Sequence, residues 1–200
     1  LRRALLAGLT LALVLASCGT PTPRTEVVVA VVAEPGIDAI ATRLVVQVFA
    51  GDATGFVPDG ANEVTLPASA SVEQTLGTNA NPVEFPVEVA LVPLRGDATR
   101  RYLVVAEAVD ASGTVVARVR AISGYVPRRT LSLTLTLEDS CSGVLACATG
   151  QTCRAGVCTT AVVPTTDLTP YVPPVASDAG ADAGGSDAGV ASRWVQRHYL

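Results

Sequence analysis

The residues best suited to chemistry in this 200-residue chain are four cysteines near its C-terminal end. Cys141, Cys147, Cys153 and Cys158 have the spacing C-x5-C-x5-C-x4-C, and glycines lie between them. Two disulfide bonds are favoured, because the set is even and clustered, and four cysteines allow three pairings. A structural zinc site would normally show C-x2-4-C pairs, which are absent. Free reactive thiols are the third reading.

The residue types needed for most kinds of catalysis are missing or misplaced. His198 is the only histidine, and all 14 basic residues are arginine, so lysine is absent. This excludes Ser-His-Asp and Cys-His arrangements, multi-histidine metal sites and Schiff-base chemistry. A carboxylate pair such as Glu84 and Glu88 is conceivable, but these residues and Arg128-Arg129 are interpreted as solvated surface. We therefore expect no enzyme, no catalytic residue, no metal site and no cofactor.

The chain begins with a short apolar segment that follows a positive charge. Arg2 and Arg3 precede an uncharged, largely apolar stretch over 4–16, which is the layout of a secretory leader. This stretch is shorter than the roughly 20 residues that a membrane-spanning helix needs. Small residues follow it, and Cys18 comes directly after Ser17.

Leu15-Ala16-Ser17-Cys18 resembles the lipobox of bacterial lipoproteins at every position. The resemblance implies cleavage between Ser17 and Cys18, a diacylglycerol on the Cys18 thiol and an acylated new amino terminus. Several acyl chains together hold a protein firmly to a membrane. Gly19 is not the aspartate that retains enterobacterial lipoproteins at the inner membrane, so the resemblance implies an outer-membrane location.

The middle of the chain is a series of short apolar runs separated by turn residues. Residues 43–50, 83–91 and 131–137 alternate between two faces, as strands with one buried face do. The sequence Asp110-Ala111-Ser112-Gly113 predicts a four-residue hairpin loop. Pro86 within 83–91 indicates an edge strand, with Glu84 and Glu88 facing outward. Other candidate strands lie at 27–33, 63–66, 71–76, 102–109 and 114–122.

Six to eight strands without a helical period predict an all-β fold, a single β-sandwich. The segment resembles the immunoglobulin-like, fibronectin-type and transthyretin-like modules of bacterial surface proteins, which implies architecture but no activity. It lacks the cysteine pair and buried tryptophan of true immunoglobulin domains.

Asp-Ala-Gly units repeat from Asp178 onward, and such units cannot bury apolar surface. The order of a β domain, a cysteine-rich stretch and this repeat resembles that of myxobacterial-type surface lipoproteins. The expected organisation is a signal peptide at 1–17, a tether at 18–25, a β-sandwich at 26–138, a disulfide-stapled module at 139–160 and a disordered tail at 161–200.

The net charge and the composition indicate which classes of partner the protein is expected to bind. The net charge is −4 and the arginines are scattered along the sequence, so no nucleic-acid partner is expected. The sequence predicts a lipid-anchored protein of the cell envelope whose β-sandwich is a structural or protein-interaction module. The alternative is a lipoprotein that binds a carbohydrate or small ligand, which is disfavoured because few aromatic residues are available for stacking on sugars: Phe49, Phe56, Phe85, Tyr102 and Tyr125.

Overall fold

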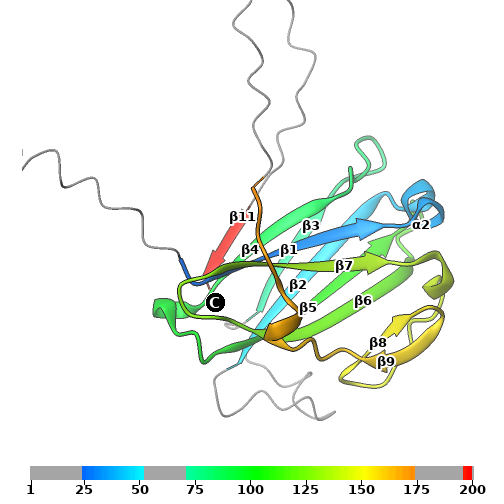
Figure 1. The fold of residues 1–200 in the computed structure, drawn as a ribbon. Helices are drawn as coiled ribbons and strands as arrows, with labels where there is room; N and C mark the ends of the chain where they lie inside the picture. The colour runs from blue at the N-terminus through cyan, green and yellow to red at the C-terminus, as the bar shows by residue number, and fades with distance from the viewer. Residues whose placement is uncertain (1–23, 52–70, 174–195, 200) are drawn as a thin grey trace, which may run out of the picture.

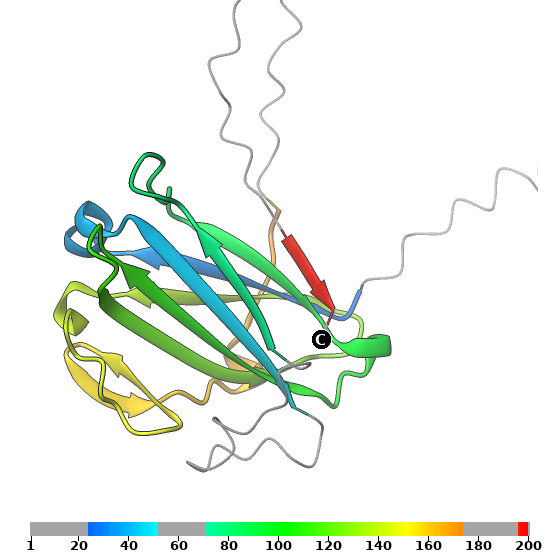
Figure 2. The ribbon, with the colours of Figure 1, turned by 180° about the vertical axis from the view of Figure 1, so that it is seen from behind.

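The fold, seen in a computed structural model that describes residues 24–51, 71–173 and 196–199, is a β-sandwich of two packed sheets (Figures 1 and 2). The prediction of an all-β sandwich is confirmed. The strands are β1 (Glu26–Ala33), β2 (Arg43–Gly51), β3 (Ser71–Leu76), β4 (Val87–Val92), β5 (Arg101–Val109), β6 (Val115–Gly124), β7 (Thr130–Leu137), β8 (Gln151–Arg154), β9 (Val157–Thr160), β10 (Thr169–Pro170) and β11 (Gln196–Tyr199).

One sheet has the strand order β10-β7-β1-β4-β11 and the other has the order β3-β2-β5-β6. In the first sheet β1 pairs antiparallel with β4 and parallel with β7, whose pairing runs from Glu26–Thr130 to Ala33–Leu137. The chain crosses between the sheets after β1, β3, β4 and β6. These crossings place the connections of the sandwich at its two ends, where loops can carry charge without disturbing the core.

Alternation along the strands explains the core. Every second residue of β2, from Leu44 to Val48, is buried, and the leucines of β7 from Leu131 to Leu137 are buried on the facing sheet. Side chains of successive strand residues point to opposite faces, so each sheet contributes one apolar face to the interface. The predicted hairpin between β5 and β6 forms, but its loop has five residues, 110–114, rather than four. Asp110 closes this loop by accepting hydrogen bonds from the main-chain nitrogens of Ser112 and Thr114 at 2.8 and 2.9 Å.

A short helix, α2 (Pro35–Ile40), follows β1 where only a strand-ending turn was expected. The side chain of Asp139, about 100 residues further along the chain, caps the start of this helix. Its carboxylate accepts hydrogen bonds from the main-chain nitrogens of Gly36 at 3.1 Å and Ile37 at 2.8 Å. A β-carbon on Gly36 would lie 2.7 Å from the Asp139 carboxylate, so the close approach requires glycine. A one-turn helix with a remote cap leaves no periodic signal in the sequence.

The strand predicted over 83–91 is wrong in its first part. The peptide bond between Phe85 and Pro86 is cis, and β4 starts only at Val87. β4 is also not an edge strand among the described strands, because it lies between β1 and β11. Glu84 is exposed as predicted, but Glu88 is buried, with 7% of its surface exposed.

The predicted disordered tail differs from the structure over residues 161–173, which we call the strap. The strap leaves the cysteine module, pairs with β6 at Val162, and then crosses to β7 through β10 (Figure 1). Ala161 and Leu168 are buried, and the Tyr171 hydroxyl donates a hydrogen bond to Glu88 at 3.0 Å. The prediction is wrong for these residues. Residues 196–199 form β11, parallel to β4, while the Asp-Ala-Gly units lie outside the described residues.

Candidate functional site

The four clustered cysteines form two disulfide bonds. Cys141 pairs with Cys153, with Cα atoms 5.8 Å apart, and Cys147 pairs with Cys158, with Cα atoms 5.5 Å apart. The pairing is first-to-third and second-to-fourth, one of the three that the sequence allowed. Ser17 and Cys18, the predicted cleavage and lipidation residues, lie outside the described residues, as do the leader and candidate strand 63–66.

The cysteine module, residues 139–160, is fastened to the edge of the second sheet rather than hanging from it. Its β8–β9 hairpin lies beside β6, where the Thr152 hydroxyl accepts a hydrogen bond from the main-chain nitrogen of Arg120 at 2.9 Å. The Arg118 side chain donates to the Leu145 carbonyl at 3.2 Å and pairs with Glu107 at 2.5 Å. Thr152 and Cys153 are buried in this contact. The module therefore extends the rigid body of the sandwich.

Three carboxylates gather where β7 meets this module, and each is engaged by the main chain. Asp139 caps α2, Glu34 accepts a hydrogen bond from the Asp139 nitrogen at 2.7 Å, and Glu138 accepts one from the Ala155 nitrogen at 2.5 Å. Hydrogen bonds from main-chain amides satisfy these carboxylates, so their role is to join α2, β7 and the hairpin. In the described part of the chain, no group of three or more histidine, cysteine or acidic residues is arranged to hold a metal ion.

The other carboxylate pair considered from the sequence, Glu84 and Glu88, does not form a site. Glu84 is exposed ahead of β4, whereas Glu88 lies in the strand and is bonded to Tyr171 of the strap. A buried carboxylate that holds a tyrosine hydroxyl fixes the strap onto the first sheet. It is structural in this position.

Among the described residues, a shallow, open depression lies at each end of the sandwich. The first, of about 490 Å³, is lined by Arg43, Thr78, Asn79, Ala80, Ala111, Ser112 and Gly113. The second, of about 370 Å³, is lined by Ala98, Thr99, Arg100, Arg101, Gly124, Tyr125, Val163, Pro164 and Thr165. Neither is lined by an acidic side chain, so neither provides the paired acids of a glycosidase.

Aromatic side chains are used for packing. Tyr102 is fully buried and Tyr125 is 6% exposed, and their rings meet edge to face with centroids 5.1 Å apart. Burial raises the pKa of both hydroxyls. Phe49 and Phe85 are partly buried against the apolar clusters. The described aromatic residues thus form no exposed row on which a sugar could stack.

The chain matches none of the known protein families, curated proteins or solved structures with which it was compared. Within the described residues, no helix has the length and apolar character needed to cross a bilayer. The class that the fold itself defines is a disulfide-containing β-sandwich with a strap across one side.

Proposed function

We propose that this protein is a lipid-anchored lipoprotein of the bacterial cell envelope, and that its β-sandwich serves as a structural or protein-interaction module. The observation that carries the proposal is the distribution of the five cysteines. Four are paired with one another in two disulfides, and the fifth, Cys18, stands directly after a leader-like segment. Disulfides persist in oxidising compartments, which supports export, and Cys18 then has the lipid as its partner.

The packing of the domain supports an interaction module over an enzyme or a sugar-binding protein. The depressions at the two ends are shallow, Tyr102 and Tyr125 are buried, and Phe49 and Phe85 are partly buried against apolar clusters. Recognition in such a domain is carried by loops and by strand edges. Among the described strands, β3 is an edge strand of its sheet, with β2 as its neighbour on one side, so a strand from a partner could add to it. The partner would be an extended segment of another envelope or extracellular protein.

The experiment that tests the anchor is metabolic labelling with an alkyne-bearing fatty acid. The full-length chain, expressed in a Gram-negative host, is expected to carry the label. The Cys18→Ser variant is expected to lose it completely. A Thr20→Ser variant, changed two residues further on, serves as the matched control and should be labelled as strongly as the unchanged chain. A chain that takes up no label, or a Cys18→Ser variant labelled to the same extent, would contradict the proposal.

A further inference from the structure

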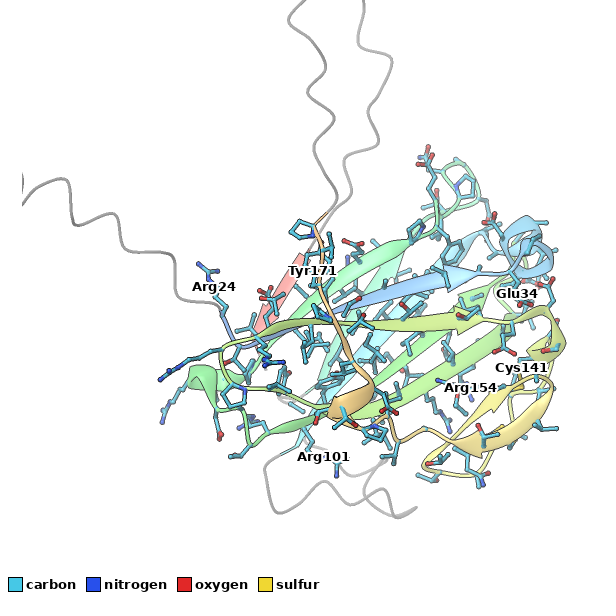
Figure 3. All side chains as sticks on the ribbon, in the orientation of Figure 1. Arg24, Glu34, Arg101, Cys141, Arg154 and Tyr171 are labelled. Atoms are coloured by element: carbon cyan, nitrogen blue, oxygen red, sulfur yellow. A yellow bond between two sulfur atoms is a disulfide. The ribbon has the colours of Figure 1, made fainter. Side chains whose placement is uncertain are left out.

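More than half of the described arginines, although scattered along the sequence, gather at one end of the described domain. The N-terminal stretch before β1, the η2 turn (Leu94–Gly96) with the start of β5, and the connection from β6 to β7 all lie at that end. Together these segments carry six of the eleven described arginines, which we call the basic end: Arg24, Arg95, Arg100, Arg101, Arg128 and Arg129. Figure 3 shows Arg24 at this end and Glu34, Cys141 and Arg154 at the other.

Register explains why these distant residues meet. The Arg129 carbonyl accepts a hydrogen bond from the Glu26 nitrogen at 3.1 Å, and the Thr25 hydroxyl accepts one from the Arg128 nitrogen at 2.9 Å. Arg101, the first residue of β5, pairs with Gly124, the last residue of β6. The hydrogen bonds of Arg128 and Arg129 involve only their main chain, and their exposed side chains form no hydrogen bond or ion pair with described residues.

The acidic residues at the two ends of the described domain are distributed the other way. At the basic end they are Asp97 and Asp167, both exposed, and Glu26, which is buried. The opposite end has six acids around Arg43 and Arg154: Glu34, Asp38, Glu84, Asp110, Glu138 and Asp139. Asp52, Asp59 and Glu63 belong to the segment 52–70, which lies outside the described residues and connects Gly51 with Ser71, both at the basic end. The described domain thus has a positive and a negative end.

The turn between β4 and β5 adds an apolar contact to the positive charge. Leu94 is 48% exposed, one of four large apolar side chains that stand out from the described surface, and Arg95 follows it with a φ of 58°. An exposed leucine flanked by arginine suits the boundary between lipid headgroups and acyl chains.

We propose that the basic end docks against anionic lipid headgroups, so that the acidic end and the cysteine module point away from the membrane. This inference rests on the proposed lipid anchor, because the anchor holds this end near the bilayer. Cys18 and Arg24 are six residues apart, which an extended chain spans in about 20 Å. Each arginine near an anionic surface strengthens binding about five-fold, and the effect fades within a Debye length of about 8 Å at physiological salt.

The test removes the anchor and keeps the surface. The chain from residue 18 to 200 with Cys18→Ser is mixed with vesicles of phosphatidylcholine alone or with 30% phosphatidylglycerol, at low and high salt, and the bound fraction is measured by sedimentation. Binding to the phosphatidylglycerol vesicles alone, weakened at high salt, is expected. Arg128→Gln with Arg129→Gln should weaken that binding by about 10- to 30-fold, because two arginines are lost.

The matched control is Arg43→Gln with Arg154→Gln, two arginines at the acidic end, which should change binding less than two-fold. Equal binding to neutral and anionic vesicles, no binding to either, or equal losses from the two double variants would overturn the docking proposal. Those results would leave the lipid anchor untouched, because fatty-acid labelling of Cys18 is measured separately. Conversely, an unlabelled Cys18 would refute the anchor whatever the vesicles show.

Discussion

At the scale of single residues, five acidic side chains of this protein accept hydrogen bonds from main-chain amides: Glu34, Asp97, Asp110, Glu138 and Asp139. Asp139 caps α2 across 103 positions of sequence, and Asp110 and Asp97 close the turns that contain them. Such local contacts for Asp110 and Asp97 can be predicted from Asp-x-Ser and Asp-x-Thr patterns. The contact of Asp139 with Gly36 could not, because only the tertiary fold brings them together.

Replacing Asp139 with alanine should lower the free energy of unfolding by about 1 kcal/mol, the usual effect of losing a helix N-cap. The measurement is chemical denaturation followed by circular dichroism. Asp139→Asn, which keeps one acceptor oxygen, should lose less, and Asp38→Ala, an exposed residue of the same helix, should change little. Equal losses from Asp139→Ala and Asp38→Ala would mean that the carboxylate does not cap α2.

The contribution of Asp110 should depend on pH in a defined direction. Hydrogen bonds from the Ser112 hydroxyl, and then from the Thr114 main chain, lower the pKa of Asp110 below its ordinary value of 3.8. A lowered pKa in the folded state means that the ionised carboxylate stabilises the fold above pH 3.8. This stabilisation is lost as the pH falls through the folded-state pKa. The stability difference between the unchanged chain and Asp110→Ala should therefore be larger at pH 7 than at pH 2.5, as measured by urea denaturation. A difference that grows on acidification would contradict this.

At the scale of elements, alternation predicted most of the strands. β2, β5, β6 and β7 could be located from the sequence because each has one apolar face toward the core. The strand predicted over 83–91 begins too early, because the apolar residues alternate through the whole run. The chain before Val87, which includes the cis peptide bond between Phe85 and Pro86, is not a strand. The strap was missed because its proline and threonine content is typical of linkers, although Leu168 enters the core.

The strap should be an integral part of the fold. Leu168→Ala should lower the free energy of unfolding by about 2–4 kcal/mol, because the side chain is buried between the sheets. Val172→Ala is the control, since Val172 is 80% exposed and should contribute little. Thermal denaturation of both variants decides the matter. A Leu168→Ala variant as stable as the control would show that the strap does not cover the core.

The cysteine pairs should stabilise the module without being required for the sandwich. Cys147→Ser with Cys158→Ser removes one disulfide bond. This should lower the free energy of unfolding by about 3 kcal/mol, as expected for the loss of a disulfide that closes a loop with a sequence separation of 11. Hydrogen exchange should show β8 and β9 losing protection while β1, β2 and β5 keep it. Peptide mapping under non-reducing conditions should detect one disulfide-linked peptide pair that contains Cys141 and Cys153 and another that contains Cys147 and Cys158. Detection of another pairing, or of free thiols, would refute the observed connectivity.

At the scale of the whole molecule, the charges of the described domain are arranged along one axis. The chain enters the sandwich at the basic end, and the disulfide module lies at the far, acidic end (Figure 3). This polarity was invisible in the sequence, because Arg24, Arg95 and Arg128 belong to three separate connections that only strand register brings together. The proposed leader and the lipobox-like pattern at Cys18 rest on the sequence alone, since both are local patterns that need no fold.

The central claim, that Cys18 is the lipid-bearing first residue of the mature protein, is tested most directly by mass spectrometry. The native protein would be extracted from envelopes with detergent, and its N-terminal peptide would be weighed. We expect a peptide that begins at Cys18 and exceeds its polypeptide mass by a diacylglycerol and an additional acyl chain. A peptide that retains Arg2 and Arg3, or one whose Cys18 has the mass of unmodified cysteine, would contradict the claim.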